Sequence, residues 1–380
     1  AAKAPLADPS RETEAEELEE IEEAPAADAA QGYAEQDAEP VQRYAKQPTP
    51  ERTEAPAAEA ETPAAEAETP AAEETAAAAG DYTLGMGISL STDSSKTGNA
   101  QVDATVATVV TDADGKIVVC RLDVAQSKMD ISAGTVDTAK TFLTKMELGD
   151  DYGMVAYGNA IAEWYDQAKA FESYVVGMTG DEVANLETVL NDSGHNVSTD
   201  ETLLAGCTMD IVAFKDAVSK ACGDVNTMAF TSDGTFTLGV AAKTTAAEST
   251  DPTDDADGVV KMYTDFGAAV VDANGVILAA VNDATQPQIS FNADGEITDT
   301  VFKGTKMELG DDYGMVAYGA AIAEWDAQSA AFSAYTVGKT ADEVRGIETT
   351  ENDHGYSVAA DETLYASCTM QITGMMDVIA

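Results

Sequence analysis

A fifteen-residue sequence, TKMELGDDYGMVAYG, occurs twice in this chain without a single difference, at residues 144–158 and 305–319. The second copy therefore starts 161 residues after the first. The same offset relates later pairs of residues, namely Trp164 and Trp325, Phe171 and Phe332, and Cys207 and Cys368. The chain is a tandem duplication, and identity over this stretch, between copies that differ elsewhere, indicates a tight local constraint.

The duplication divides the 380 residues into three parts. We expect a disordered acidic tail at residues 1–80, a first repeat at 81–222 and a second repeat at 233–380. Each repeat has the size of a common domain and can bury a core of its own. The tail is rich in Ala, Glu and Pro, so it has too little apolar surface to offset its ordering entropy. It fits a stalk-like spacer, and a solubilising tail equally well.

Charge restricts the classes of partner. The chain has 20 Lys and Arg against 69 Asp and Glu, a formal net charge of −49, which argues against nucleic acid or anionic lipid. No run of about 18 apolar residues is present, so no membrane-spanning helix is predicted. The first residue is Ala1, which fits a processed chain or a fragment. We therefore expect no direct membrane span.

Strand signals open each repeat. DYTLGMG (81–87) and DGTFTLGV (233–240) each predict an opening strand, in which Gly85 and Gly239 serve a bulge or a close backbone approach. Residues 101–123 and 259–283 each contain two β-branched runs around Asp114-Gly115 or Asn274-Gly275. These dipeptides favour type I′ turns, so each region is predicted to form an antiparallel hairpin.

Helix signals follow the repeated segment. In the first repeat the apolar residues recur at three- and four-residue steps and predict a helix that ends at Gly177; these residues are Ile161, Trp164, Ala168, Phe171 and Val175. Thr179 and Glu182 have the spacing of a capping box and predict a second, short helix. Residues 201–211 and 362–372 are interpreted as strands or strand-like turns, each followed by a closing helix. The predicted class is α+β: two tandem copies of an antiparallel sheet with packed helices.

Four motifs resemble the FMN-binding domain family, whose members are extracytoplasmic flavin carriers. They are the opening DGTYTG-like strand, the DGKI turn at 114–117, the acid-and-glycine loop ELGDDYGM at 147–154 and 308–315, and a Thr-containing motif before the closing helix. The family has Ser-Gly-Ala-Thr at that last position, where this chain has AGCT (205–208) and ASCT (366–369). The resemblance spans both repeats.

The resemblance implies a flavin site in each repeat. It makes Thr208 and Thr369 the anchors of FMN, through a phosphoester bond if the attachment is covalent. Glycines would let the backbone approach the cofactor, tyrosines would stack on its ring, and glutamates would accept hydrogen bonds from it. These implied residues are Gly149, Gly153, Gly310, Gly314, Tyr152, Tyr313, Glu147 and Glu308.

The same residues also have a purely structural interpretation, in which the glycines and tyrosines shape a tight corner and the glutamates cap turns. Trp164 and Trp325 lie on an apolar stripe and are predicted to be core residues. His195 and His354 are not equivalent under the repeat offset, so a metal or general-base role is not expected. No catalytic residues and no metal site are predicted.

Cysteine spacing gives no zinc or thioredoxin-like motif. Cys120 and Cys222 occur only in the first repeat. They could form a disulfide with each other or remain buried free thiols, and free thiols are favoured.

Two functions remain. One is an extracytoplasmic electron-transfer protein that carries FMN in two domains and exchanges electrons with a redox partner protein or a quinone-linked system. The other is a secreted or cell-surface binding or structural module that keeps the fold without flavin. In either case we expect an electron carrier or a binding module rather than an enzyme.

Overall fold

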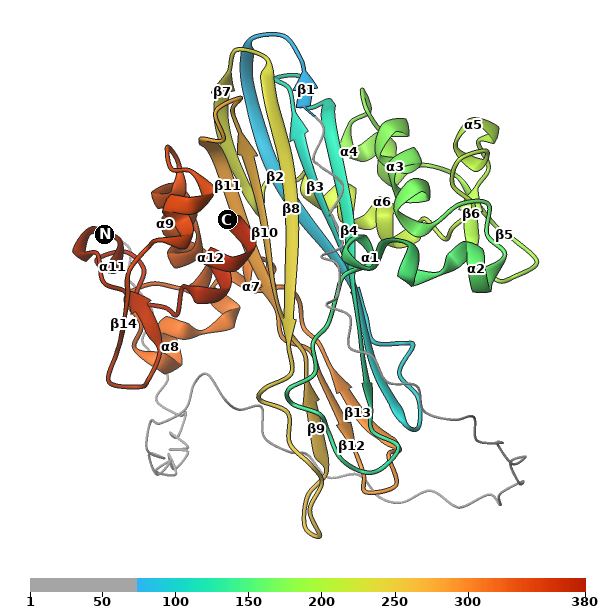
Figure 1. Ribbon diagram of the computed structural model, residues 1–380, viewed down its shortest axis with the longest axis vertical. Coiled ribbons are helices and arrows are strands. Elements are labelled where there is room, and N and C mark those ends of the chain that lie inside the picture. Colours follow the sequence, from blue (N-terminus) through green and yellow to red (C-terminus); the bar gives the residue numbers. More distant parts are fainter. Residues whose placement is uncertain (1–73) are drawn as a thin grey trace, which may run out of the picture.

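The computed structural model describes residues 74–380, which form four layers, with two antiparallel sheets facing each other between two layers of helices (Figure 1). This confirms the predicted α+β class. Most of the predicted disordered tail lies outside the described residues. Its predicted end at Gly80 was too late, because residues 74–76 already form a strand.

The first-repeat sheet has the strand order β4-β3-β2-β7 and the second-repeat sheet the order β1-β8-β10-β11. The strands of the first are β2 (Gly80–Ser91), β3 (Asn99–Thr111), β4 (Ile117–Asp130) and β7 (Thr227–Ser232). Those of the second are β1 (Glu74–Ala76), β8 (Thr235–Thr245), β10 (Tyr263–Val271) and β11 (Ile277–Thr285).

The first short strand of each repeat belongs to the sheet of the other repeat. β1 precedes β2 in the chain but pairs with β8, with Thr75 opposite Phe236. β7 precedes β8 but pairs with β2, with Phe230 opposite Tyr82. The repeats are thus joined by an exchange of strands as well as by the chain.

The two sheets share a hydrophobic core. Its buried side chains come from both repeats and include Leu84, Val106, Phe236, Phe266 and Val281. Rings of Tyr82, Phe230 and Phe236 contact one another there, at centroid distances of 5.4 to 5.7 Å. Burial of this apolar surface holds the two repeats face to face, at about 25 cal/mol per Å² removed from water.

The lower part of the sandwich in Figure 1 differs between the repeats. β3 and β4 run on as continuous strands of 13 and 14 residues. In the second repeat the equivalent hairpin is interrupted at Met262 and at Pro287, since proline has no N–H to give to a ladder. A separate sheet of order β13-β12-β9 results, from β9 (Gly258–Lys261), β12 (Gln288–Phe291) and β13 (Ile297–Val301).

Helices of each repeat cover the outer face of its own sheet (Figure 1). In the first repeat they are α1 (Lys145–Leu148), η1 (Gly149–Tyr152), α2 (Met154–Gly158), α3 (Trp164–Tyr174), α4 (Gly180–Ala184), α5 (Glu201–Leu204) and α6 (Val212–Ala221). In the second they are α7 (Lys306–Leu309), η2 (Gly310–Tyr313), α8 (Met315–Gly319), α9 (Trp325–Thr336), α10 (Ala341–Arg345), α11 (Glu362–Tyr365) and α12 (Thr373–Ile379). Two small hairpins complete the layers: β5 (Thr188–Leu190) with β6 (Asn196–Ser198), and β14 (Thr349–Glu351) with β15 (Ser357–Ala359).

Residues 201–211 and 362–372, interpreted as strands or strand-like turns, do not form strands. Each begins with a helical turn, α5 or α11, because Asp200 or Asp361 caps it. The Asp200 carboxylate accepts hydrogen bonds from the Thr202 and Leu203 N–H groups, which a helix leaves without internal partners.

The predicted hairpins are confirmed, but their turns are not of type I′. That type needs a positive φ at both central residues, and only Gly115 has one in the first turn. The Gly115 N–H donates to the Asp112 carbonyl, and the Asp112 carboxylate accepts from the N–H groups of Asp114 and Lys116. The aspartate at the start of the turn therefore sets its type.

Gly85 meets its prediction and Gly239 does not. A Cβ on Gly85 would lie 2.0 Å from the Ala221 carbonyl oxygen, so α6 crosses β2 at that glycine. The nearest atom to a Cβ on Gly239 is 4.0 Å away, and the ladder continues through it without a bulge. Ile161 was also placed wrongly: it precedes α3 and is 58% exposed, whereas Trp164 is buried as predicted.

Candidate functional site

The identical segment forms the same corner in both repeats, a chain of short helices between the sheet and the Trp-bearing helix. Its first residue, Thr144 or Thr305, starts a capping box. The Thr144 hydroxyl accepts from the Glu147 N–H at 3.2 Å, and the Glu147 carboxylate accepts from the Thr144 N–H at 2.7 Å. Glu308 makes the same bonds with Thr305 at 3.1 and 2.9 Å.

A buried carboxylate from the sheet lies beneath each capping box. Asp123 of β4 accepts from the Met146 N–H at 3.1 Å, and Asp283 of β11 accepts from the Met307 N–H at the same distance. Burial raises the pKa of Asp123 to about 6 and that of Asp283 to about 7, against the hydrogen bonds that favour ionisation. These aspartates fix the first turn of α1 and α7 to the sheet.

The lysine of each copy lies over aromatic rings. The Lys145 ammonium is 4.8 Å from the centroid of Tyr152 and 5.6 Å from that of Trp164. In the second repeat Lys306 is buried, 4.8 Å from Tyr313 and 5.4 Å from Trp325. Cation–π attraction at such distances contributes about 0.5–2 kcal/mol, so each lysine joins the corner to the helix behind it.

Glycines make the corner sharp. Gly149 and Gly310 end the first turn with φ of 50° and 48°, and Gly153 and Gly314 follow the 3-10 turn with φ of 75° and 80°. Side chains other than glycine rarely adopt such backbone angles.

The next short helix is capped by the start of the long one. The Glu163 carboxylate accepts from the N–H groups of Met154 and Val155 at 2.8 and 3.0 Å, and Glu324 does the same in the second repeat. The corner is thus closed on both sides by hydrogen bonds.

Thr208 and Thr369, the proposed flavin anchors, lie after the helical turns α5 and α11. The Thr208 N–H donates to the Gln167 side-chain oxygen at 2.9 Å, and its hydroxyl lies 3.2 Å from the same oxygen. Thr369 makes the same contacts with Gln328, at 2.8 and 3.2 Å. Both hydroxyls are half-buried and are used within the fold.

The first turn of α3 brings the predicted motifs to one region of the fold. The Gln167 side chain accepts a hydrogen bond from the Thr208 N–H. Four residues earlier, the Glu163 carboxylate accepts one from Met154, the first residue of the last short helix in the identical segment. The predicted residues have internal roles there: Glu147 and Glu308 cap helices, and Tyr152 and Tyr313 lie against the lysines. A cavity of about 310 Å³ lies elsewhere, beside Tyr335 and Glu348. A second cavity, of about 260 Å³, lies at the start of α9 and is lined by Met307 and Asp326. Neither is lined by a predicted flavin residue.

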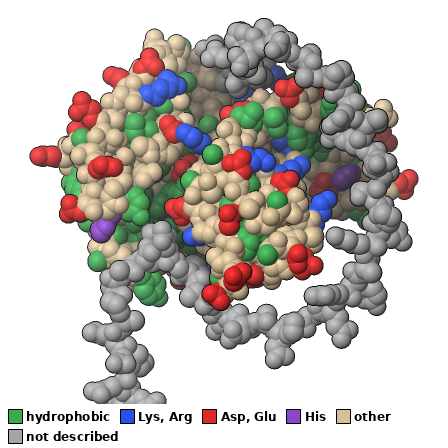
Figure 2. Space-filling view, turned by 60° about the horizontal axis from the view of Figure 1, so that its bottom comes forward, with side chains coloured by type: hydrophobic (Ala, Val, Ile, Leu, Met, Phe, Trp, Pro, Cys, Tyr) green, Lys and Arg blue, Asp and Glu red, His purple; other side chains and the backbone are tan. Residues whose placement is uncertain are grey.

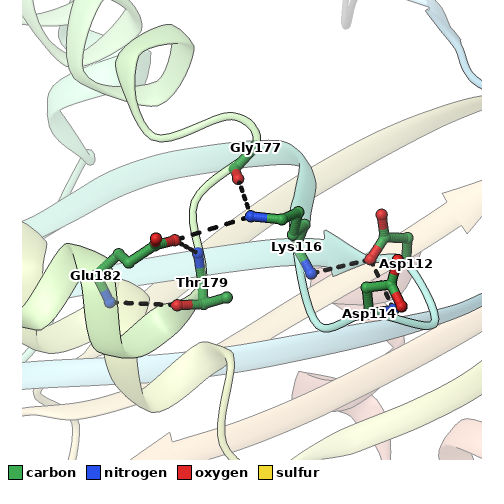
Figure 3. A network of polar contacts seen from close by, with 6 residues as sticks. All are labelled: Asp112, Asp114, Lys116, Gly177, Thr179 and Glu182. Atoms are coloured by element: carbon green, nitrogen blue, oxygen red, sulfur yellow. Dashed lines mark hydrogen bonds and ion pairs between the residues drawn. The ribbon is translucent and has the colours of Figure 1, made fainter.

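The DGKI turn of the resemblance is also tied to the helical layer (Figure 3). The Lys116 ammonium donates to the Gly177 carbonyl at 2.9 Å and lies 4.0 Å from the Glu182 carboxylate. Ile117 exchanges backbone hydrogen bonds with Met178 and Gly177. The turn therefore holds the end of α3 and the capping box of α4.

Sequence reasoning missed Asp123 and Asp283. Each is a polar residue within an apolar pattern and has a counterpart in the other repeat. This recurrence could have marked them in the sequence. Sequence reasoning also missed the surface of the corner.

The far side of the corner exposes apolar side chains in both repeats. Tyr157 is 91% and Tyr318 76% exposed, and the paired residues Val155 and Val316, and Ile161 and Ile322, are each about half exposed. A Cβ on Gly153 would lie 2.5 Å from the Tyr157 ring, and Gly314 has the same relation to Tyr318. The glycine therefore makes room for the exposed ring.

The cysteines are free thiols, as favoured from the sequence. Burial raises the pKa of Cys222 and of Cys368 to about 11, so burial, not nearby acids, suppresses their reactivity. His195 and His354 lie in the exposed turns of the two small hairpins. Within residues 74–380 no group of three or more His, Cys, Asp and Glu is arranged to hold a metal ion.

No family model matches the chain, and no curated protein matches it. Among solved structures, a Bacteroides fragilis protein with a YmcC-like fold, provisionally described as exported, has 9% identity and a TM-score of 0.11. That similarity covers 62% of this chain and 99% of the other. Among the helices of residues 74–380, none is long and apolar enough to cross a bilayer.

Proposed function

We propose that this protein is a non-catalytic binding module of the cell surface or the extracellular space, which presents the same recognition surface twice. We call the surface of Val155, Tyr157 and Ile161 the first tyrosine patch, and that of Val316, Tyr318 and Ile322 the second. The observation that carries the proposal is that the two most exposed tyrosines of residues 74–380 lie within the identical segment.

Folding accounts for the rest of that segment but not for its exposed residues. The threonine, lysine, glutamate, glycines and first tyrosine make internal contacts, as described above. Val155 and Tyr157 face solvent, where the fold places no demand on identity. Exposed apolar side chains on a rigid support are typical of protein interaction sites, and tyrosine is frequent at their centres.

The two patches lie on opposite sides of the sandwich, since α2 and α8 cover opposite outer faces (Figure 1). One chain can therefore engage two partners, or two sites on one large partner, and gain avidity.

Selection of displayed peptides on the immobilised full chain tests the proposal. The variant Tyr157→Ser/Tyr318→Ser serves for counter-selection, because these exposed side chains do not support the core. We expect peptides that bind the wild-type chain and not the variant. If no peptide is enriched, or if the same peptides bind both chains equally, the patches are not recognition surfaces.

A second candidate function is the extracytoplasmic FMN carrier that exchanges electrons with a redox partner protein or a quinone-linked system. The observation that favours it is the convergence of Thr208 and the identical segment on the first turn of α3. Covalent attachment would require the Thr208 hydroxyl to leave Gln167.

Co-expression with a flavin transferase tests this second function. A yellow protein whose mass rises by one or two FMN groups, and which loses that mass in Thr208→Ala/Thr369→Ala, supports it. A colourless protein that takes up no added FMN refutes it.

A further inference from the structure

The charge around the tyrosine patches indicates the chemistry of their partner, an inference that rests on the proposed function. The 3-10 turn directly before α2 exposes Asp150 and Asp151, and α3 exposes Asp166 in its first turn. The equivalent turn before α8 exposes Asp311 and Asp312. We call these exposed carboxylates, which flank each patch along the chain, its acidic rim.

Few Lys or Arg residues lie near the rims along the chain: exposed Lys169 follows Asp166 by three residues in the first repeat, where the second repeat has Ala330. In the second repeat, residues 307–338 contain five acidic residues and no Lys or Arg. Lys145 and Lys306 lie against aromatic rings on the inner side of the corner, and Lys220, which pairs with Glu308 at 3.0 Å, comes from α6. In Figure 2 acidic side chains are spread over the visible face, so an acidic surface alone does not mark a site. The distinguishing feature is the exposed tyrosine within it.

An exposed tyrosine ring inside an anionic rim suits one kind of side chain best. An arginine guanidinium stacks on the face of an aromatic ring and also hydrogen-bonds to carboxylates. The valine and isoleucine, two residues before and four residues after the tyrosine in the chain, are about half exposed and add apolar area that arginine alone would not use. A partner needs both cationic and apolar side chains to cover the patch.

We propose that each tyrosine patch binds an arginine-containing segment of a partner protein that also carries apolar side chains, with two such segments bound per chain. A second copy of this chain is disfavoured as the occupant, because two acidic rims would face each other. The rim charges steer association and make it sensitive to salt.

Titration of the full chain with a fluorescent ten-residue peptide of alternating arginine and leucine tests the proposal. Two matched peptides replace leucine by serine or arginine by glutamate. We expect two bound arginine–leucine peptides per chain, weaker binding at high salt, and at least about tenfold weaker binding of both control peptides. Tyr157→Ala and Tyr318→Ala should each leave one site.

The double variant Tyr157→Ala/Tyr318→Ala keeps every charge of the chain, so it separates patch binding from general attraction to an acidic protein. We expect it to lose affinity about tenfold or more, while Tyr356→Ala, in an exposed hairpin turn, binds as the wild type does. Equal binding by the double variant, or by the arginine–serine peptide, overturns the inference. If peptide display finds tyrosine-dependent ligands without arginine, the inference fails while the proposed function stands.

Discussion

The buried carboxylate Asp283 makes a quantitative prediction about stability and pH. Its side chain is 5% exposed and accepts hydrogen bonds from the Ala284 and Met307 N–H groups at 2.7 and 3.1 Å. Burial raises its pKa from 3.8 to about 7, although these bonds and the Thr305 hydroxyl act in the opposite direction. The folded protein thus holds a proton that the unfolded chain has released above about pH 4.

A raised pKa in the folded state stabilises the protein at low pH, and that stability is lost as the pH rises through about 7. For a shift from 3.8 to about 7, proton linkage reduces the free energy of unfolding by about 2.5 kcal/mol between pH 5 and pH 8. Asp283→Asn has a similar shape, can still accept both N–H bonds, and does not titrate. We expect the variant to lose this part of the pH dependence.

Urea unfolding of the wild type and of Asp283→Asn at pH 5, 6, 7 and 8, at constant ionic strength, measures the effect. Asp294→Asn, in an exposed turn, controls for the loss of one negative charge. Asp123, Asp265 and Glu172 also have pKa values raised by burial, so the variant should keep a weaker trend in the same direction. An unchanged slope in Asp283→Asn would show that this carboxylate is ionised in the fold throughout the range.

Three further predictions concern packing. Gly85→Ala should lower the free energy of unfolding by about 1–3 kcal/mol, because its Cβ would meet the Ala221 carbonyl, whereas Gly239→Ala should stay within about 1 kcal/mol of wild type; urea midpoints compare them. Residues 1–226 and 227–380 should each be insoluble when expressed separately, because each half lacks one strand of its sheet and half of the shared core. When the two halves are co-expressed, they should co-purify. A monomeric half that unfolds cooperatively would contradict this prediction. Cys222 should be the first cysteine to react with a thiol reagent in the native protein, and Cys222→Ser should remove that fast phase, since the other three thiols are buried.

Local signals in the sequence predicted the parts of the fold that depend on few residues. The Asp-Gly and Asn-Gly dipeptides located both hairpins, and Thr179 with Glu182 located a capping box that forms as expected. The turn type was missed because the aspartate two residues earlier, Asp112, captures the backbone N–H groups. The hydrogen bonds of the Asp112 side chain therefore outweigh the preference of the Asp-Gly dipeptide for a type I′ turn.

The packing of the two sheets could not be predicted, because it depends on what lies opposite each strand. β3 is buried along nearly its whole length, which the sequence shows as a β-branched run without showing that one face meets the other repeat. β1 has only the residues Glu-Thr-Ala, which carry no strand signal, so its pairing with β8 was invisible.

The sequence predicted the backbone shape of the identical segment but not which of its side chains are exposed. The identical segment was interpreted as a shaped corner, and the corner is present. Asp123 and Asp283, which support it, come from strands more than twenty residues earlier, so no local pattern connects them. The exposure of Tyr157 was hidden because Met-Val-Ala-Tyr looks like core sequence.

The exchanged strands have the geometry of a homodimer in which each subunit lends its first strand to the other, with the two subunits fused into one polypeptide. In a dimer of separate chains, every substitution appears in both halves, and assembly depends on protein concentration. Fusion removes both restrictions. The halves could then diverge: Arg121 and Glu172 form an ion pair outside β4, whereas Asn282, Ser329 and Ser333 form a neutral network outside β11. Although the two halves were free to diverge, the residues of the corner are identical in both.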